Sequence, residues 1–292
     1  YKRQTLTMIA SPLAEGLFHK AISQSGYVSS YSAEYAESIS ELSSKNIFAE
    51  DIKYLTDSNE IVDYLQGLTQ TEVYEKYIAT AEQYVYPITP ITVRDGIVVP
   101  KEGVYKALEK ADPDLIVVAG TNKDEMNYWF VNSEYFYDTS FEIRRTLKRS
   151  EANLRSWNKF RSAIWRYKGA EEPLRRMSKS NDNLYSYRLD WDEEDDGIFG
   201  DYSLFVGAAH GIDVPFISNS FDMEQIPWYI RNILFPESSA EGRDALSSLM
   251  MRYWGNIAKY GDPNVFVSQK WEKFTANDNH CLLYTSDAAD DC

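Results

Sequence analysis

The sequence predicts an α/β protein in which helices flank a mostly parallel β-sheet, and three features of the chain support this. Leu115–Ala119 is a continuous apolar run of strand length, as expected for a parallel strand that is buried on both faces. Leu184–Trp191 alternates as a second strand would. Apolar residues from Leu246 to Ala258 recur at i, i+3 and i+4, which predicts an amphipathic helix that Gly261–Pro263 ends. Strands separated by helices, with no long internal repeat, indicate an α/β layered domain.

The N-terminal third contributes a helix, a strand and outer helices. The first ten residues predict a helix that ends near Pro12, and Lys20–Ser25 predicts a short strand that leads to Gly26. Ser32–Asn46 and Asn59–Glu82 are polar with spaced apolar residues, which is typical of helices on the outside of a domain.

Three further segments complete the expected elements. Asp95–Gly96 is a turn signal, and the β-branched run Ile97–Pro100 follows it. Phe141–Lys168 is helical in character and locally basic, with nine Lys or Arg against two Glu. A nucleic-acid contact is one interpretation of this segment, but a solvated helix face in an acidic protein is the better one. An acidic loop, Asp192–Asp196, follows the second strand. We find no linker that would split residues 1–280 into independent domains.

Composition limits the partners of the chain. Its 292 residues are 43% hydrophobic, enough to bury one large core or two modest ones. A net charge of -15 disfavours nucleic acid and anionic membrane surfaces as general partners. No apolar run approaches the roughly 20 residues of a membrane span. No signal peptide is present, but the start resembles the interior of a longer sequence, so localisation stays open.

Two segments carry residues suited to catalysis. Asp124 and Glu125 directly follow the first buried strand, and reactive groups collect beyond the carboxyl ends of parallel strands. His210 lies between small residues that allow a sharp loop. Taken singly, a carboxylate pair more often marks a solvated helix start, and a lone loop histidine is more often structural. Together, an acid followed about 85 residues later by a histidine fits the order Ser, acid, His of α/β-hydrolases.

Separated motifs in the right order give a family resemblance. Ser11–Gly26 resembles the stretch after the nucleophile elbow in type-B carboxylesterases, the family that includes the cholinesterases. Tyr253–Asn264 resembles the C-terminal helix of that family, and Trp271 with Phe274 resembles its closing strand. The resemblance implies that residues 1–280 are the C-terminal half of an α/β-hydrolase domain. It also implies that the nucleophilic serine lies about two residues before Tyr1, outside this chain.

The same resemblance implies roles for individual residues. Glu125 maps to the catalytic acid of a Lys-Asp-Glu-Gly-like motif, with Met126 in the place of Gly. His210 maps to the base of a His-Gly-x-Glu-like motif, with Asp213 in the Glu position as a supporting residue. Ser25 maps to a serine that hydrogen-bonds near the acid. The expected activity is hydrolysis of small-molecule carboxylic esters through an acyl-serine intermediate, without a metal or an organic cofactor. The fragment alone is expected to be inactive.

Other interpretations stay open. A cholinesterase-like binding or adhesion domain could keep the fold without the nucleophile, although it has no chemical reason to keep both Glu125 and His210. An enzyme that acts on amides or carbamates is compatible with the fold. Ser156–Lys159 matches an S-x-x-K pattern but lacks its companion motifs, so we discard it. The ester substrate, the organism and the oligomeric state do not follow from the sequence.

The C-terminal tail is treated separately. Cys281–Asp291 resembles the in-frame translation of a transposase adaptor, and a natural acidic tail is the alternative. We therefore expect residues 281–292 to lack fixed packing, although a short strand over Leu282–Tyr284 is compatible because it mimics the apolar ending of the family. Both cysteines, Cys281 and Cys292, lie in this tail, so a disulfide framework and a thiolate metal site are not expected elsewhere. The absence of disulfides and of glycosylation sequons leans towards a bacterial protein.

Overall fold

The chain forms two compact units in the computed structural model. The described residues are 2–38, 47–81, 92–140, 144–197, 200–224, 226–277 and 280–284. The larger unit comprises residues 1–10, 14–28 and 105–292, and the smaller comprises residues 11–13 and 29–104. The sequence analysis found no linker at this division. The physical basis of the division is that each unit buries its own apolar cluster.

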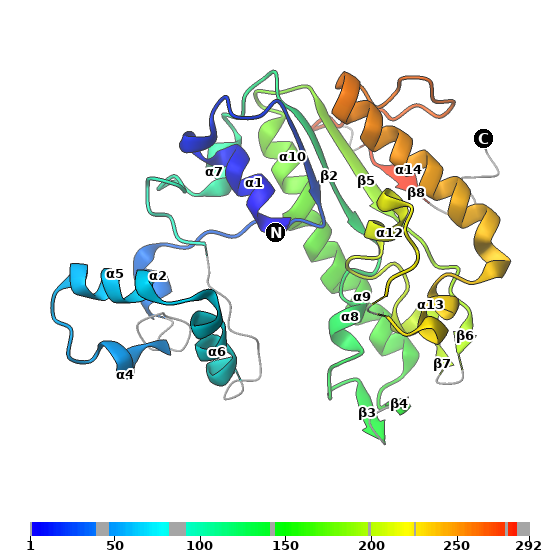
Figure 1. Ribbon diagram of the computed structural model, residues 1–292. Coiled ribbons are helices and arrows are strands. Elements are labelled where there is room, and N and C mark those ends of the chain that lie inside the picture. Colours follow the sequence, from blue (N-terminus) through cyan, green and yellow to red (C-terminus); the bar gives the residue numbers. More distant parts are fainter. Residues whose placement is uncertain are drawn as a thin grey trace. The chain divides into compact units, whose positions relative to one another are not determined.

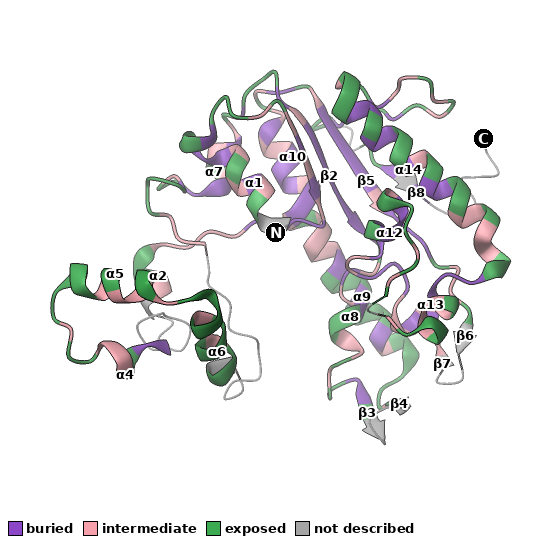
Figure 2. Cartoon of the chain, viewed as in Figure 1, coloured by how far each residue is buried: buried purple, intermediate pink, exposed green. Residues whose placement is uncertain are grey.

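A parallel sheet forms the centre of the larger unit. Its strands have the order β1–β2–β5–β8, and every neighbouring pair is parallel (Figure 1). Their bounds are β1 (Lys20–Gln24), β2 (Ile116–Asn122), β5 (Leu184–Leu189) and β8 (Leu282–Tyr284). Figure 2 shows β2 and β5 buried along nearly their whole length. The strand predictions for Lys20–Ser25, Leu115–Ala119 and Leu184–Trp191 are therefore confirmed.

Helices cover the sheet. Tyr253, Trp254 and Ile257 of α14 (Ala240–Tyr260) pack in the apolar cluster that includes Tyr187 of β5. α14 ends at Gly261, whose φ of 76° places it in the left-handed region that favours glycine, as the sequence predicted.

A second run of helix contacts β2 and β5 and lies on the other side of the sheet from α14 (Figure 1). It consists of α9 (Glu151–Arg166), the π-helical turn η3 (Tyr167–Glu171) and α10 (Glu172–Met177). The remaining helical segments of the larger unit are shorter: α1 (Lys2–Ala10), α7 (Val104–Leu108), α8 (Asn127–Phe130), α11 (Tyr202–Phe205), α12 (Asp213–Ser218), α13 (Trp228–Leu234) and η4 (Glu237–Ser239). The predicted N-terminal helix is α1.

The prediction of one helix over Phe141–Lys168 is wrong at its start. Arg144–Leu147 forms strand β4, which pairs antiparallel with β3 (Tyr137–Ser140), and α9 begins only at Glu151. Ser150 caps that helix, because its side chain accepts a hydrogen bond from the amide of Asn153. Residues 141–143 lie outside the described part. A second small hairpin joins β6 (Asp196–Gly197) to β7 (Gly200–Asp201).

The smaller unit is helical. Its helices are α2 (Ala33–Ser38), α4 (Ala49–Ile52), α5 (Ser58–Gly67) and α6 (Gln70–Ala81), and the 3-10 turn η1 (Pro12–Ala14) spans the division between the units. The segment Asn59–Glu82, which the sequence predicted to be helical, holds most of α5 and all of α6, and a capping box starts α6. The amide and hydroxyl of Thr69 donate to the Glu72 carboxylate, and the Glu72 amide donates back to Thr69 Oγ1. Of the helix expected over Ser32–Asn46, residues 39–46 lie outside the described part.

The loop after Asp95 forms a turn without a following strand. Asp95 Oδ1 accepts hydrogen bonds from the amides of Ile97, Val98 and Val99 at 2.9, 3.0 and 2.8 Å. In a strand, such backbone amides would donate hydrogen bonds to a neighbouring strand instead. The predicted turn is therefore confirmed, and the β-branched run does not join a sheet.

Three residues of the C-terminal tail belong to the sheet. Leu282–Tyr284 forms β8 beside β5, and Leu282 and Tyr284 are buried. This is the short strand that the sequence analysis allowed. Residues 285–292 lie outside the described part.

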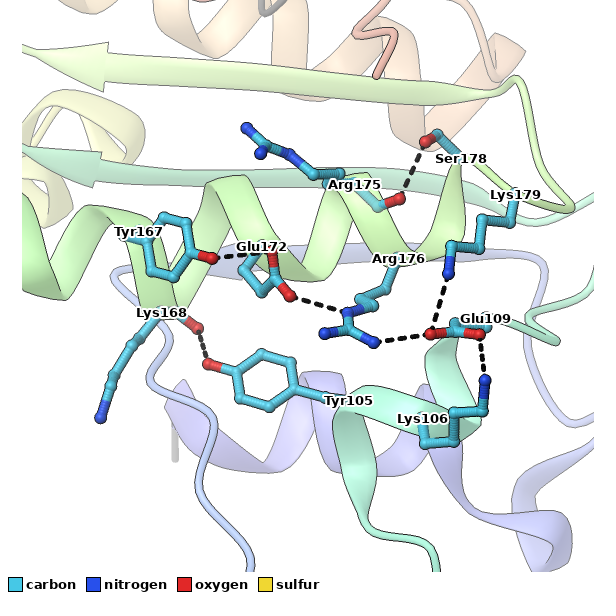
Figure 3. Close-up of polar contacts among 10 residues, drawn as sticks. All are labelled: Tyr105, Lys106, Glu109, Tyr167, Lys168, Glu172, Arg175, Arg176, Ser178 and Lys179. Carbon is cyan, nitrogen blue, oxygen red and sulfur yellow. Dashed lines mark hydrogen bonds and ion pairs between the residues drawn. The ribbon is translucent and has the colours of Figure 1, made fainter. Parts of the chain in front are cut away.

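A charged cluster joins α7 to α10 (Figure 3). Glu109 Oε2 lies 2.6 Å from Lys106 Nζ, while its Oε1 lies 2.6 Å from Arg176 and 3.0 Å from Lys179. Hydrogen bonds from Lys106, Arg176 and Lys179 lower the pKa of Glu109 from its usual 4.5 to about 2. Because the folded state lowers this pKa, the stability that Glu109 contributes is full above pH 4.5 and is lost as the pH falls towards 2.

We expect Lys106→Met to raise the titration midpoint of Glu109, because Lys106 makes the largest contribution to the lowered pKa. The midpoint is measurable from the carboxyl carbon shift in a ¹³C NMR titration. Lys148→Met is the control, since Lys148 pairs with Asp138 elsewhere. An unchanged Glu109 midpoint in the Lys106 variant would contradict the assignment.

Candidate active site

The loop that follows β2 buries a carboxylate. After Asn122 the chain turns and starts α8, and Glu125 in this turn has no exposed surface. Its Oε1 accepts a hydrogen bond from the Asn122 amide at 2.8 Å, which fixes the carboxylate against the end of the strand. The position is the carboxyl end of a parallel sheet, where the sequence analysis expected a reactive group.

A second loop brings a histidine to the same place. Gly207 and Gly211 have φ values of 51° and 94°, which allow the chain to turn sharply on both sides of His210. The two loops are joined by backbone, because the Asp124 amide donates to the carbonyl oxygen of Ala208 at 3.0 Å. The two glycines and this hydrogen bond therefore place the His210 loop beside the turn that carries Glu125.

Glu125 and His210 meet. His210 Nδ1 lies 2.5 Å from Glu125 Oε2, and about a quarter of the histidine side chain is exposed while the carboxylate is fully covered. Asp124 points elsewhere and accepts a hydrogen bond from Asn158. Burial raises the pKa of Asp124. The sequence prediction that Glu125 and not Asp124 contacts the histidine is confirmed as geometry. With Nδ1 held by a carboxylate, Nε2 is the ring nitrogen that can take a proton from a substrate group.

Of the two residues expected to support the site, Asp213 makes a side-chain hydrogen bond with a described residue there and Ser25 does not. Asp213 is fully buried in the first turn of α12, and its Oδ2 accepts from Gln24 Nε2 at 2.9 Å. Ser25 does not make the expected hydrogen bond near the acid. Its Oγ is buried and has no partner among the described residues, because Ser25 turns at a φ of 50° and uses its backbone instead. Its amide donates to Gly120, and its carbonyl accepts from Trp165 Nε1.

Aromatic rings flank the histidine, and the sequence analysis missed them. The ring centroids of Trp129 and Trp165 lie 5.3 and 5.0 Å from that of His210, and the two indoles lie 5.3 Å from each other. Tyr27 packs edge-on against Trp165 at 5.3 Å. Trp129 could have been found from the sequence, because it follows Glu125 by only four residues. Trp165 lies in a basic helix, and nothing in the sequence near it indicates a place beside His210. These rings make one side of the histidine apolar.

Another buried carboxyl group lies in the acidic loop after β5. Both carboxyl oxygens of Glu194 are buried, and neither accepts a hydrogen bond from another described residue. Burial, with Asp192, Asp124 and Glu193 nearby, raises its pKa from 4.5 to about 8. A raised carboxyl pKa means that the folded state binds more protons than the unfolded state between these values. Stability therefore falls as the pH rises from 4.5 through 8.

Glu194→Gln is expected to flatten this pH dependence. The substitution should raise the free energy of unfolding by about 2 kcal/mol near pH 9. This is roughly half of the free energy that corresponds to the full pKa shift, because the group is not completely covered. Urea unfolding at about pH 5 and about pH 9 measures the effect. Asp195→Asn, at an exposed neighbour, is the control. Equal stability gains at both pH values would contradict the prediction.

The part of the chain that the structure describes holds no group of three or more His, Cys, Asp or Glu residues that could bind a metal ion. Within those ranges, no helix has both the length and the apolar character needed to cross a bilayer.

Comparison with known proteins places the chain. A sequence profile of the Carboxylesterase family matches residues 5–170 and 143–290. The chain belongs to the carboxylesterase family. Carboxylesterase 1D of Rattus norvegicus is 23% identical over 325 residues, which cover 97% of this chain and 54% of the relative. Neuroligin-2 of the same species is 26% identical over 309 residues, which cover 90% of the chain and 34% of the relative.

Solved structures show the same fold. A PNB esterase superimposes with a TM-score of 0.70 at 17% identity, covering 98% of this chain and 57% of that protein. A carboxylesterase of Geobacillus stearothermophilus gives a TM-score of 0.66 at 18% identity, with coverages of 98% and 58%. This carboxylesterase-family chain therefore has the α/β-hydrolase fold that the sequence predicted, and it spans about half the length of carboxylesterase 1D.

Proposed function

We propose that this chain supplies the acid and the base of a serine carboxylesterase, with Glu125 as the acid and His210 as the base. The contact between His210 Nδ1 and the buried Glu125 carboxylate carries the proposal. A carboxylate in this position holds the imidazole in one tautomer and stabilises the imidazolium that forms during catalysis. The family membership of the chain supports ester hydrolysis as the chemistry.

In this proposal the nucleophile is a serine in the segment that precedes Tyr1 in a longer protein. Its hydroxyl oxygen attacks the ester carbonyl carbon while His210 Nε2 takes the hydroxyl proton. The imidazolium then gives that proton to the leaving alcohol as the carbon–oxygen bond breaks. Water then attacks the acyl carbon of the acyl-serine and passes a proton to His210. As the bond between that carbon and the serine oxygen breaks, the imidazolium returns the proton to the serine oxygen, and the carboxylic acid leaves. The hydrogen-bond donors of the oxyanion hole also come from the preceding segment, and they are often the largest single contribution to catalysis.

The substrate in this proposal is a small-molecule carboxylic ester. The indoles of Trp129 and Trp165 beside His210 offer an apolar surface to such a molecule. All steps are proton and acyl transfers, so the proposed reaction needs neither a metal nor an organic cofactor.

A second candidate is a binding domain that keeps the fold and has lost catalysis. The likeness to neuroligin-2, a relative whose name does not describe an esterase, favours it. The retained contact between Glu125 and His210 favours the esterase, because a binding surface has no use for a buried carboxylate that holds a histidine ring.

The test is to extend the chain upstream along its reading frame and to assay a p-nitrophenyl ester. We expect turnover by the extended protein and none by the 292-residue chain alone. His210→Ala in the extended protein should remove the turnover. An extended protein with an intact elbow serine but no turnover would sink the esterase proposal, and a replaced serine would favour the binding domain.

A further inference from the structure

Asn122 touches both loops of the candidate site. It is the last residue of β2 and has 1% of its surface exposed. Its backbone amide donates to Glu125 Oε1 at 2.8 Å. Its side-chain Nδ2 donates to the carbonyl oxygen of Ala209, the residue before His210, also at 2.8 Å. One residue therefore holds the carboxylate with its backbone and the histidine loop with its side chain.

The same amide group reaches the helix that follows the histidine. Asn122 Nδ2 lies 3.4 Å from Asp213 Oδ1, and the other oxygen of Asp213 accepts from Gln24 at the end of β1. The buried Asp213 carboxylate thus receives neutral amide donors from the ends of two neighbouring strands. A buried carboxylate that loses such a donor becomes costly, so the donors and the carboxylate hold each other in place.

We propose that Asn122 is a positioning residue that sets the contact between Glu125 and His210. The bond from its backbone amide would survive any side chain. The bonds to Ala209 and Asp213 require a short side chain with a donor group. Leucine and ionised aspartate have a similar shape but no donor. Without them the backbone before His210 loses its anchor to β2, and the ring shifts from the carboxylate. The catalytic consequence rests on the proposed function, whereas the positional one does not.

The first test uses the 292-residue chain and the NMR signal of the His210 Nδ1 proton, assigned by its absence in His210→Gln. A proton hydrogen-bonded to a carboxylate resonates far downfield. We expect Asn122→Leu to remove this signal or to shift it strongly upfield. Asn181→Leu is the matched control, because Asn181 is an equally buried asparagine whose Nδ2 donates to the carbonyl oxygens of Asp112 and Leu115 at the other end of the sheet. The control should keep the signal although it loses these two hydrogen bonds and the one that Asn181 Oδ1 accepts from the Asn183 amide.

A second variant separates positioning from folding. Asn122→Asp keeps the shape of the side chain but, while ionised, removes the donor, so it should lose the signal as the leucine variant does. An unchanged Nδ1 proton signal in the folded Asn122→Leu variant overturns the proposal. Loss of the signal in Asn181→Leu to the same extent overturns it as well, because the effect would then be general destabilisation.

The kinetic test uses the upstream-extended protein. Asn122→Leu should lower kcat about a hundredfold while KM changes little, since a small displacement of a catalytic group acts on the chemical step. Asn181→Leu should leave kcat close to the parent value. If the extended parent shows no esterase activity, the proposed function fails, and the NMR signal still decides the position of His210. A folded Asn122 variant with parent kcat overturns the positioning role.

Discussion

Glu125→Gln in the upstream-extended protein is expected to lower kcat by about 10⁴-fold, the loss known for an acid-to-amide change in a triad. The structure gives the reason. The Asn122 amide donates to Glu125 Oε1, so a glutamine must place its oxygen there and turn its NH₂ group towards His210. His210 Nδ1 then has to accept a hydrogen bond, which puts the ring proton on Nε2. In that tautomer the ring cannot take the proton of a serine. The measurement is steady-state hydrolysis of a p-nitrophenyl ester.

Asp124→Asn provides the matched control, since it makes the same chemical change one residue earlier. Asp124 accepts a hydrogen bond from Asn158 and does not contact His210, and an asparagine can keep that bond through its oxygen. We expect kcat to stay near the parent value. A large loss in the Asp124 variant with a small loss in the Glu125 variant would mean that the acid is assigned to the wrong residue.

The elements that the sequence predicted well are those whose residues are buried by the sheet. Leu115–Ala119 could be assigned because a strand covered on both faces has to be apolar throughout. Strand β4 was missed, because its four residues Arg144–Leu147 form a polar hairpin that no apolar pattern marks. The smaller unit was missed for a similar reason. Its core is the small cluster of Ile47 and Phe48, too few residues to be visible as a separate domain in the sequence.

The candidate site divides in the same way. Glu125 and His210 could be assigned from their place after strands and their order along the chain. The roles of Trp165 and Asn122 depend on contacts between residues that are far apart in the sequence. Trp165 precedes His210 by 45 residues, and Asn122 precedes Ala209 by 87. A sequence contains no local signal for such contacts. Ser25 shows the converse. Its motif predicted a side-chain bond, but a φ of 50° turns it so that only its backbone makes hydrogen bonds among the described residues.

Gly169→Ala is expected to destabilise the larger unit by about 3 kcal/mol, as overpacking against rigid backbone does. Gly169 lies in the π-helical turn η3, and a Cβ atom there would come within 1.8 Å of the carbonyl oxygen of Gly26. Backbone atoms on both sides leave no side chain that could move aside. The turn would have to move away from β1, which would stretch the hydrogen bond from Trp165 Nε1 to the carbonyl oxygen of Ser25, 3.2 Å long in the parent chain.

The free energy of unfolding in urea measures this effect, and Gly255→Ala is the matched control. Gly255 is an exposed glycine within α14, and a Cβ atom there meets nothing within 4 Å. The same substitution should therefore stabilise the chain by about 1 kcal/mol, the helix preference of alanine over glycine. Because Trp165 packs on His210, the Gly169 variant should also change the indole fluorescence of the folded state, whereas the Gly255 variant should not. A Gly169 variant as stable as the parent would contradict the prediction. It would show that η3 can move away from Gly26 without a loss of stability, and that the close approach of Gly169 to Gly26 does not fix Trp165 beside His210.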